Sequence, residues 1–413
     1  MIQTNQPVSQ NDSLLSRGMI AVLAAQFFSA LADNALLFAA IAMLKFLQAP
    51  DWQTPLLQGF FAIAFIFLAP FVGPFADSWP KGRVMLVANA MKCAGAVAML
   101  FGLHPLLAYN LVGVGAAAYS PAKYGILSEL VGADKLVKAN SMMEGSTIVA
   151  ILLGAVLGGM LADWSITAAL TGVAACYGIA GLANLFIPKL PPAHPLATFS
   201  PIALINDFWI ALNTLVRNPD ARFSMLGTSV FWGSGSTLRF LLVAWVPVAL
   251  FIADNGTAAN LSGVVAIGIA LGAAAAAKFV NLETINRALP AGILIGLLIP
   301  VFAHTTNLPT AAMMLILIGA CGGFYVVPLN ALLQERGHET VGSGHAIAIQ
   351  NVFENFMMII MVGLYTLMVK AGMPVVASAS LFGLLVFLAI GMLAWLRMRK
   401  MKGVAVSIED VTR

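Results

Sequence analysis

Charge is scarce in this sequence, because Asp, Glu, Lys and Arg together make up 9% of its 413 residues while hydrophobic residues make up 60%. A soluble domain carries about 25% charged residues, so this composition excludes an ordinary water-soluble fold. Long polar stretches are also missing, since most of the chain divides into apolar segments of about 20 residues or more, separated by short polar connections. The sequence therefore predicts a membrane protein.

Residues that bind metals or react with substrates are sparse as well. The three cysteines lie inside apolar segments without CxxC spacing, which favours packing over redox chemistry or metal binding. His338 and His345 flank a loop and are expected to be polar caps rather than metal ligands. There is no P-loop motif and no His-x-x-x-x-Asp acyltransferase motif. We therefore expect no metal, no cofactor other than a coupling ion, and no enzyme activity.

Twelve apolar segments are each long enough to cross about 30 Å of hydrocarbon as a helix. The first is too long for the apolar region of a signal peptide and has no small-residue cleavage site, so it is expected to be retained. The fold class expected is an all-α membrane protein. The predicted spans are 18–47, 54–76, 84–103, 105–130, 140–162, 166–188, 223–252, 262–281, 288–304, 309–334, 343–369 and 374–396.

Lysine and arginine gather at the N-terminus, in the even-numbered connections and at the C-terminus. Such residues are enriched on the cytoplasmic side of membranes, so both termini are predicted to be cytoplasmic. The same bias accounts for the net charge of +4, which is therefore no indication of nucleic-acid binding.

The longest polar connection falls between the sixth and seventh spans and divides the chain into two halves of six helices. The predicted parts are a first half at 1–188, a cytoplasmic linker at 189–222, and a second half at 223–413 with a short tail. A weak repeat supports this division: Asn140-xxx-Glu144 in the fifth span matches Gln350-xxx-Glu354 in the eleventh. Chance similarity between Gly- and Ala-rich helices is the alternative explanation.

The loop after the second span contains GPFADSWPKGR, Gly73 to Arg83. This stretch, like the two halves of six, resembles the major facilitator superfamily, whose signature at this place is G-x-L-a-D-r-x-G-r-k; here one extra residue precedes Gly82. In that superfamily the loop helps to hold the cytoplasmic side closed. The resemblance implies this gating role for Asp77 and Arg83, and the alternative is an ordinary positively charged loop.

Charged residues inside the spans are the strongest indication of function. An ionisable group in hydrocarbon costs several kcal/mol unless it is paired or faces a wet cavity. Asp33, Arg239 and Glu354 lie near the middle of the first, seventh and eleventh spans and are predicted to meet in one central cavity. Helical spacing places further site residues on the same faces or beside these charges, namely Gln26, Asn34, Trp232, Ser236 and Gln350. Trp232 either lines the cavity or packs against lipid.

The three central residues carry two negative charges and one positive charge. We expect the surplus to be relieved by a proton, a bound Na⁺ or a cationic part of the substrate. The alternative is a structural salt bridge between Asp33 and Arg239. Lys123 and Glu144, with Glu129 at the boundary, form a second layer predicted to be an inner gate or headgroup exit. The alternative for Lys123 is snorkelling to the membrane surface.

Several stretches resemble the bacterial lysophospholipid transporter (LplT) family more specifically, among them AQFFSALADNALLFA, GVGAAAYSPAKYGILSEL, FWGSGSTLRFLLVAWVPVAL and GGFYVVPLNALLQERG. Members of that family flip lysophospholipids, chiefly lysophosphatidylethanolamine and lysophosphatidylglycerol, from the outer to the inner leaflet of the bacterial inner membrane. A cytoplasmic acyltransferase/acyl-carrier-protein synthetase then restores the second acyl chain. The resemblance implies this function, this location and this separate partner enzyme.

A lysophospholipid suits the predicted site. A guanidinium such as that of Arg239 binds phosphate well, and the carboxylate of Asp33 or Glu354 can receive an ammonium or a coupling ion. The acyl chain is expected between apolar helix faces open to lipid. Two alternatives are the efflux of an amphipathic drug or organic cation, and a scaffold for the acyltransferase that does not transport.

Overall fold

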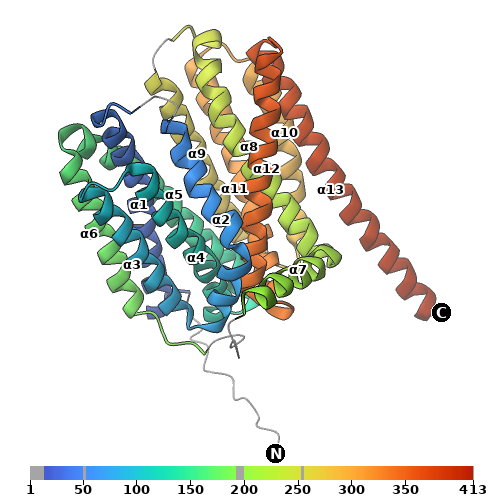
Figure 1. Cartoon of the computed structure of the whole chain (residues 1–413). Helices are drawn as coiled ribbons and strands as arrows, with labels where there is room; N and C mark the ends of the chain where they lie inside the picture. Colours follow the sequence, from blue (N-terminus) through green and yellow to red (C-terminus); the bar gives the residue numbers. More distant parts are fainter. Residues whose placement is uncertain (1–13, 50–52, 192–199, 253–254, 413) are drawn as a thin grey trace, which may run out of the picture. The chain divides into compact units, whose positions relative to one another are not determined.

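The computed structural model describes residues 14–49, 53–191, 200–252 and 255–412. These residues form α-helices, two short 3-10 helices and no strand (Figure 1). The helices are α1 (Arg17–Phe46), α2 (Gln53–Ser78), α3 (Lys81–Leu100), α4 (Pro105–Leu130), α5 (Leu136–Trp164), α6 (Ile166–Leu185), α7 (Pro201–Arg217), α8 (Pro219–Ala249), α9 (Asn255–Phe279), α10 (Leu289–Ala303), α11 (Leu308–Glu339), α12 (Ser343–Lys370) and α13 (Val375–Thr412), with the 3-10 helices η1 (Ala133–Lys135) and η2 (Ile285–Ala288) before α5 and α10.

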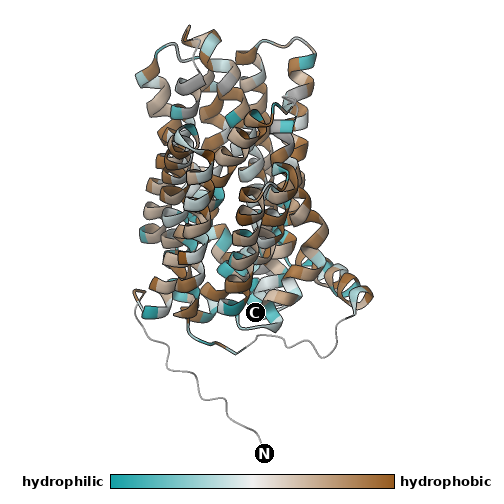
Figure 2. Ribbon diagram, turned by 60° about the vertical axis from the view of Figure 1, so that its left-hand side comes forward, coloured by the Kyte–Doolittle hydropathy of each residue, from teal (hydrophilic) through white to brown (hydrophobic). Residues whose placement is uncertain are grey.

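Each of the twelve predicted spans corresponds to one of these helices, which confirms the all-α membrane fold. Within the described residues, ten helices are long and apolar enough by composition to cross a membrane. The other two predicted spans, α4 and α8, have 26 and 31 residues. Figure 2 shows hydrophobic residues along most of the length of the helices and hydrophilic residues mainly toward their ends.

The connection predicted as a linker at 189–222 contains one further helix, α7. Its apolar residues Leu204, Phe208, Ala211 and Leu215 are buried and recur at the spacing of one helical face. Trp209, which follows Phe208 in the chain, is exposed. This helical spacing can be seen in the sequence, but no helix was predicted here because the connection as a whole is polar.

The chain divides into two compact units. Unit 1 comprises the chain up to Trp209 together with Gly337–Ala348, and unit 2 comprises Ile210–Arg336 and the chain from Ile349 onward. The loop after α11 and the first residues of α12 therefore pack with unit 1, although they come from the second half of the sequence.

In unit 1, α1 packs against α5 and α6, α3 packs against α4 and α6, and α2 packs against α4. The α1–α5 contact is close because it is made by glycine: a Cβ on Gly158 would lie 2.5 Å from the Cα of Ala35. Small residues allow such close packing where lipid supplies no hydrophobic driving force between helices. In unit 2, α8 packs against α9 and α13, and α10 packs against α13.

Candidate functional site

Asp33 lies on α1 in unit 1 and forms an ion pair within the span. Its Oδ2 lies 2.8 Å from Nζ of Lys92 on α3, and its Oδ1 accepts a hydrogen bond of 2.7 Å from the hydroxyl of Tyr177 on α6. The Asp33 side chain is 24% exposed, whereas that of Lys92 is 2% exposed. Lys92 on α3 and Tyr177 on α6 thus hold the carboxylate in place, and part of it remains accessible.

Lys92 is surrounded by further polar and aromatic groups. Its Nζ also lies 3.0 Å from Oγ of Ser29 and 4.7 Å from the centre of the Tyr119 ring. Ser29 in turn donates a hydrogen bond of 2.8 Å to Oδ1 of Asn89. We call these residues the Asp33 cluster: Asp33, Ser29, Asn89, Lys92, Tyr119 and Tyr177.

The charge count made from the sequence was wrong because it left out Lys92. Lys92 balances the charge of Asp33 within unit 1, and with this lysine included the charges counted are two negative (Asp33 and Glu354) and two positive (Lys92 and Arg239). Asn89 and Lys92, three residues apart inside an apolar span, are the signal that would have identified a polar face on α3. Within unit 1, the ion-pair partner of Asp33 is Lys92.

Two other predicted site residues on α1, Gln26 and Asn34, each donate a hydrogen bond. Gln26 is buried and donates a hydrogen bond of 2.8 Å to Oγ1 of Thr147 on α5. Asn34 donates a hydrogen bond of 2.8 Å to the carbonyl oxygen of Ala30, one turn earlier on its own helix. Gln26 therefore fixes α1 against α5.

In unit 2, Gln350 links three helices. Its Nε2 lies within hydrogen-bonding distance of Oε1 of Glu354 on α12 (2.8 Å), Oγ1 of Thr228 on α8 (3.0 Å) and Oδ1 of Asn330 on α11 (2.7 Å). Gln350 and Asn330 are buried. We call these residues the Glu354 cluster: Gln350, Glu354, Thr228 and Asn330. The sequence analysis did not select Asn330.

Arg239 lies on one accessible face of α8. Trp232, Gly235 and Arg239 are exposed, and Ser236 is partly exposed. These residues recur at three- and four-residue spacing, while Gly233, Ser234, Thr237 and Leu238 on the other side are buried. Arg239 therefore lies on the accessible face of α8. Asp33 belongs to unit 1 while Arg239 and Glu354 belong to unit 2, so their meeting in one cavity stays a prediction.

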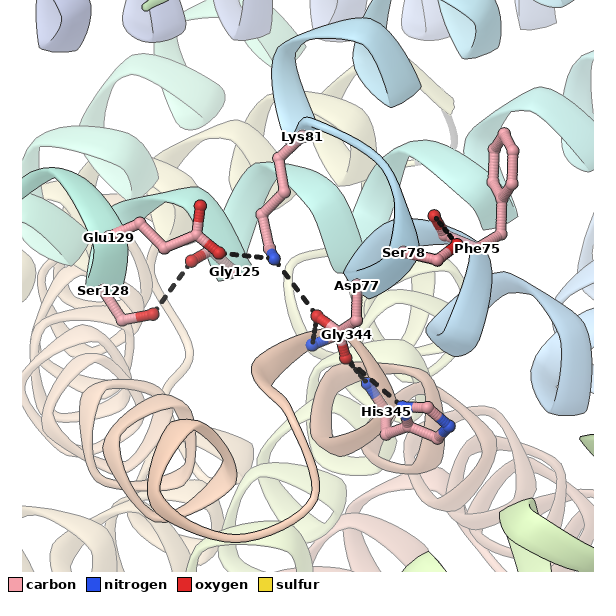
Figure 3. A network of polar contacts seen from close by, with 9 residues as sticks. All are labelled: Phe75, Asp77, Ser78, Lys81, Gly125, Ser128, Glu129, Gly344 and His345. Atoms are coloured by element: carbon pink, nitrogen blue, oxygen red, sulfur yellow. Dashed lines mark hydrogen bonds and ion pairs between the residues drawn. The ribbon is translucent and has the colours of Figure 1, made fainter. Parts of the chain in front are cut away.

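A second charged site lies at the end of α2 (Figure 3). The Asp77 carboxylate is buried and accepts hydrogen bonds from the backbone N–H groups of Gly344 (2.9 Å) and His345 (3.1 Å) at the start of α12. Nζ of Lys81 lies 3.1 Å from Oδ1 of Asp77 and 2.6 Å from Oε1 of Glu129 on α4. We call these five residues the Asp77 cluster.

The cation of this cluster is Lys81, whereas the sequence analysis had selected Arg83 as the gating cation. Lys81 is 2% exposed, although the sequence suggested an ordinary loop cation, and Arg83 is exposed. Nδ1 of the His345 ring lies 3.2 Å from Oδ2 of Asp77. First-turn N–H groups of a helix have no intrahelical partner and carry partial positive charge, so a carboxylate at this position stabilises the start of α12.

Two residues of the predicted inner layer, Glu144 and Lys123, both contact Tyr124. The hydroxyl of Tyr124 on α4 donates a hydrogen bond of 2.6 Å to Oε1 of Glu144 on α5, and Nζ of Lys123 lies 4.5 Å from the centre of the Tyr124 ring. Glu144 is buried, and Lys123 is partly exposed. Within the described part of the chain, no group of three or more His, Cys, Asp or Glu residues is arranged to hold a metal ion.

Comparisons with known proteins agree with this architecture. A sequence profile of the Major Facilitator Superfamily matches residues 22–362. The lysophospholipid transporters LplT of Yersinia pestis (strain Pestoides F) and Yersinia pseudotuberculosis serotype O:3 (strain YPIII) are each 58% identical over 373 residues, covering 90% of this chain and 92% of theirs.

Two solved structures show the same fold. The human organic anion transporter MFSD10 (TETRAN) aligns with a TM-score of 0.74 at 15% identity, covering 91% of this chain and 99% of that one. The transporter FucP in the outward conformation aligns with a TM-score of 0.69 at 14% identity, covering 92% and 98%. At such low identity the likeness shows the fold alone.

Proposed function

Since this chain belongs to the major facilitator superfamily and, within it, to the lysophospholipid transporter LplT family, we propose that it flips lysophospholipids across the bacterial inner membrane by alternating access. The proposed substrates are lysophosphatidylethanolamine and lysophosphatidylglycerol, moved from the outer to the inner leaflet for re-acylation. The relatives at 58% identity are named as transporters, which supports transport over enzyme activity.

The observation that carries this proposal is the accessible carboxylate of Asp33 within a span. A charge in hydrocarbon is costly unless it is paired or faces a wet cavity. Asp33 is paired with Lys92, and its side chain is 24% exposed. Such a group is suited to receive the ammonium or hydroxyl groups of a lipid headgroup.

Arg239 is the proposed phosphate ligand. Its guanidinium lies on an exposed helix face between polar and aromatic neighbours, and guanidinium binds phosphate with two parallel hydrogen bonds. Glu354, fixed by Gln350, is the proposed second acceptor for the headgroup. The single acyl chain would lie along apolar helix faces, while the protein spares the headgroup the cost of crossing hydrocarbon unsolvated.

The Asp77 cluster is proposed as a latch on the cytoplasmic side. It ties the start of α12, from the second half of the sequence, to α2, α3 and α4. Opening toward the cytoplasm would require these hydrogen bonds to break and those of the next state to form. In this proposal both termini are cytoplasmic, in agreement with the distribution of cations, and a separate cytoplasmic acyltransferase consumes the product.

Efflux of an organic cation is less well supported than lipid import. A surplus of negative charge would favour a cationic substrate, and Lys92 removes that surplus. If the protein were a scaffold that does not transport, nothing would explain why it bears the energetic cost of placing Asp33, Arg239 and Glu354 inside the membrane.

The proposal is tested by uptake of labelled lysophosphatidylethanolamine into transporter-deficient spheroplasts that express either the wild type or Asp33→Asn at equal levels. We expect uptake by the wild type and a strong loss in the variant. Asp207→Asn, which changes an exposed aspartate on α7, is the matched control and should transport like the wild type. Uptake no higher than in cells without the protein would refute the proposed substrate.

A further inference from the structure

Helix α7, outside the predicted spans, has two apolar faces. The first is buried and consists of Leu204, Phe208, Ala211 and Leu215. The second recurs at the same three- and four-residue spacing, and none of its members is buried; it consists of Ile202, Ile205, Trp209, Leu212 and Val216. We call this second set the α7 stripe.

The α7 stripe is accessible along the length of the helix. The exposed fractions are 82% for Ile202, 41% for Ile205 and 61% for Trp209, and Leu212 and Val216 are partly exposed. Single apolar residues scattered over a surface in water are normal, but a continuous apolar row marks a surface that contacts a partner. The stripe therefore fits an apolar partner.

The rest of the α7 surface is mostly polar. At about 100° per residue, the stripe lies next to the buried face, and the polar face continues from it around the helix. The polar face carries these exposed residues: Asn206, Asp207, Asn213, Thr214 and Arg217, together with Ala203 and Ile210. A helix with one face toward protein, one apolar face and one polar face is suited to the boundary where protein, lipid and water meet.

The C-terminal end of α7 is held beside a membrane span. α7 ends at Arg217 and α8 begins at Pro219, so Asn218 alone separates them. The backbone of Asn218 is extended (φ −74°, ψ 119°), and its Oδ1 accepts hydrogen bonds of 3.0 and 3.1 Å from the N–H groups of Asp220 and Ala221. Because α8 corresponds to the seventh predicted span, α7 ends where that span leaves the hydrocarbon.

We propose that α7 lies in the plane of the membrane, with the α7 stripe inserted among the lipids of the cytoplasmic leaflet and the polar face in water. Trp209 suits this position, since tryptophan is enriched at the boundary between membrane and water. The partner of this surface is the lipid bilayer itself. The choice of leaflet follows from the proposed orientation of the chain, whereas insertion depends on neither that orientation nor the substrate.

The charge of α7 indicates which property of the lipid holds it. Its 17 residues include one anion, Asp207, and one cation, Arg217, so the helix has no net side-chain charge that would attract anionic headgroups. Helices that bind membranes through charge are instead rich in Lys and Arg on their polar face. Insertion of α7 is therefore driven by burial of apolar surface, and it should be the same in zwitterionic and anionic membranes.

The experiment places single nitroxide labels on full-length protein without its native cysteines, reconstituted in phosphatidylcholine vesicles. Ile205→Cys and Trp209→Cys report on the stripe, and Asn206→Cys and Asn213→Cys report on the polar face; all four positions are exposed. Collisions with O₂, which concentrates in hydrocarbon, are compared with collisions with a water-soluble nickel chelate. We expect the ratio of O₂ to nickel collisions to be severalfold higher on the stripe than on the polar face.

A charge on the stripe should disturb this contact. With the label at Trp209→Cys, Ile205→Glu should raise nickel collisions severalfold, because a carboxylate is costly to place in hydrocarbon. Asn213→Glu is the matched control and should leave them unchanged. Nickel collisions that stay low in Ile205→Glu would contradict insertion of the stripe.

Vesicles that also contain phosphatidylglycerol test the role of charge. We expect the same ratios as in phosphatidylcholine alone, and insertion only in the anionic vesicles would overturn the apolar basis of the contact. Equal nickel collisions on the two faces would place the stripe in water and refute the inference. Protection of the stripe from both O₂ and nickel would also refute it, because protein, such as a second copy of the chain, would then cover the stripe.

The proposed function is tested separately on the same vesicles. Uptake of labelled lysophosphatidylethanolamine reports on transport, and the collision ratios report on the position of α7. Absence of uptake with a high ratio on the stripe would refute the proposed substrate and leave the membrane contact of α7 supported.

Discussion

The carboxylate of Asp77 accepts a hydrogen bond from the backbone N–H of Gly344, a residue 267 positions away in the chain. This contact places an acidic side chain from the end of α2 at the start of α12, where the free N–H groups of the first helical turn need acceptors. A short loop motif in the first half of the sequence thereby holds a segment from the second half.

Replacement of Asp77 by Asn should open this contact. The amide keeps one acceptor oxygen but loses the charge that pairs with Lys81, so we expect a loss of about 1–3 kcal/mol in stability. The measurement is thiol labelling of Ser343→Cys, a buried position beside the cluster, in a background without the native cysteines. Labelling should be faster with Asp77→Asn and unchanged with the control Asp207→Asn. Equal labelling of Ser343→Cys alone, with Asp77→Asn and with Asp207→Asn would show that Asp77 does not hold the start of α12.

Gly344 has no room for a side chain. A Cβ at this position would lie 2.7 Å from Oδ1 of Asp77, so Gly344→Ala should lower the melting temperature and uptake, at a cost of about 1–3 kcal/mol. Gly363 lies on the same helix with open space around its Cβ position, and Gly363→Ala should be neutral or stabilising by up to about 1 kcal/mol. Melting curves of the two variants, measured side by side, test the difference; similar effects would remove the steric argument.

Substitution of Arg239 by Lys should reduce uptake although the charge is kept. Lysine cannot form the two parallel hydrogen bonds that guanidinium makes to phosphate, and losing one charge-assisted bond costs about 1.5–3 kcal/mol, or roughly a 10- to 100-fold decrease. Arg222→Lys, at an exposed position near the start of the same helix, is the control. Initial uptake rates over a range of lysophospholipid concentrations provide the measurement, and wild-type rates in Arg239→Lys would refute the phosphate role.

Tyr177 and Tyr365 are both buried and allow the effect of losing a hydroxyl to be compared. The hydroxyl of Tyr177 donates to Asp33, and Tyr177→Phe should lower stability by about 1.5–3 kcal/mol because a hydrogen bond to a charged group is lost. The hydroxyl of Tyr365 has no hydrogen-bond partner among the described residues, so Tyr365→Phe should be neutral or stabilising. Thermal unfolding in detergent compares the two, and an equal loss in both variants would contradict the role of the Tyr177 hydroxyl.

The sequence alone predicted the helices well, because a span of the bilayer demands a long apolar segment and every such segment became a helix. It also selected Asp77 from the loop motif and Asp33, Glu144 and Glu354 from their interior positions. These predictions needed only the cost of burying charge and the length of a helix, which are properties of local sequence.

The partners of these residues were decided by tertiary structure. Asp33 pairs with Lys92 and Asp77 pairs with Lys81, and neither lysine was selected as a site residue from the sequence. Helical periodicity gives the face on which a side chain lies, but it does not give the rotation of one helix against another or the depth at which two helices cross. The sequence by itself therefore determined that charges enter the membrane, and the packing of α1 with α3 and α6 determined which charges neutralise each other and which edge of Asp33 stays accessible.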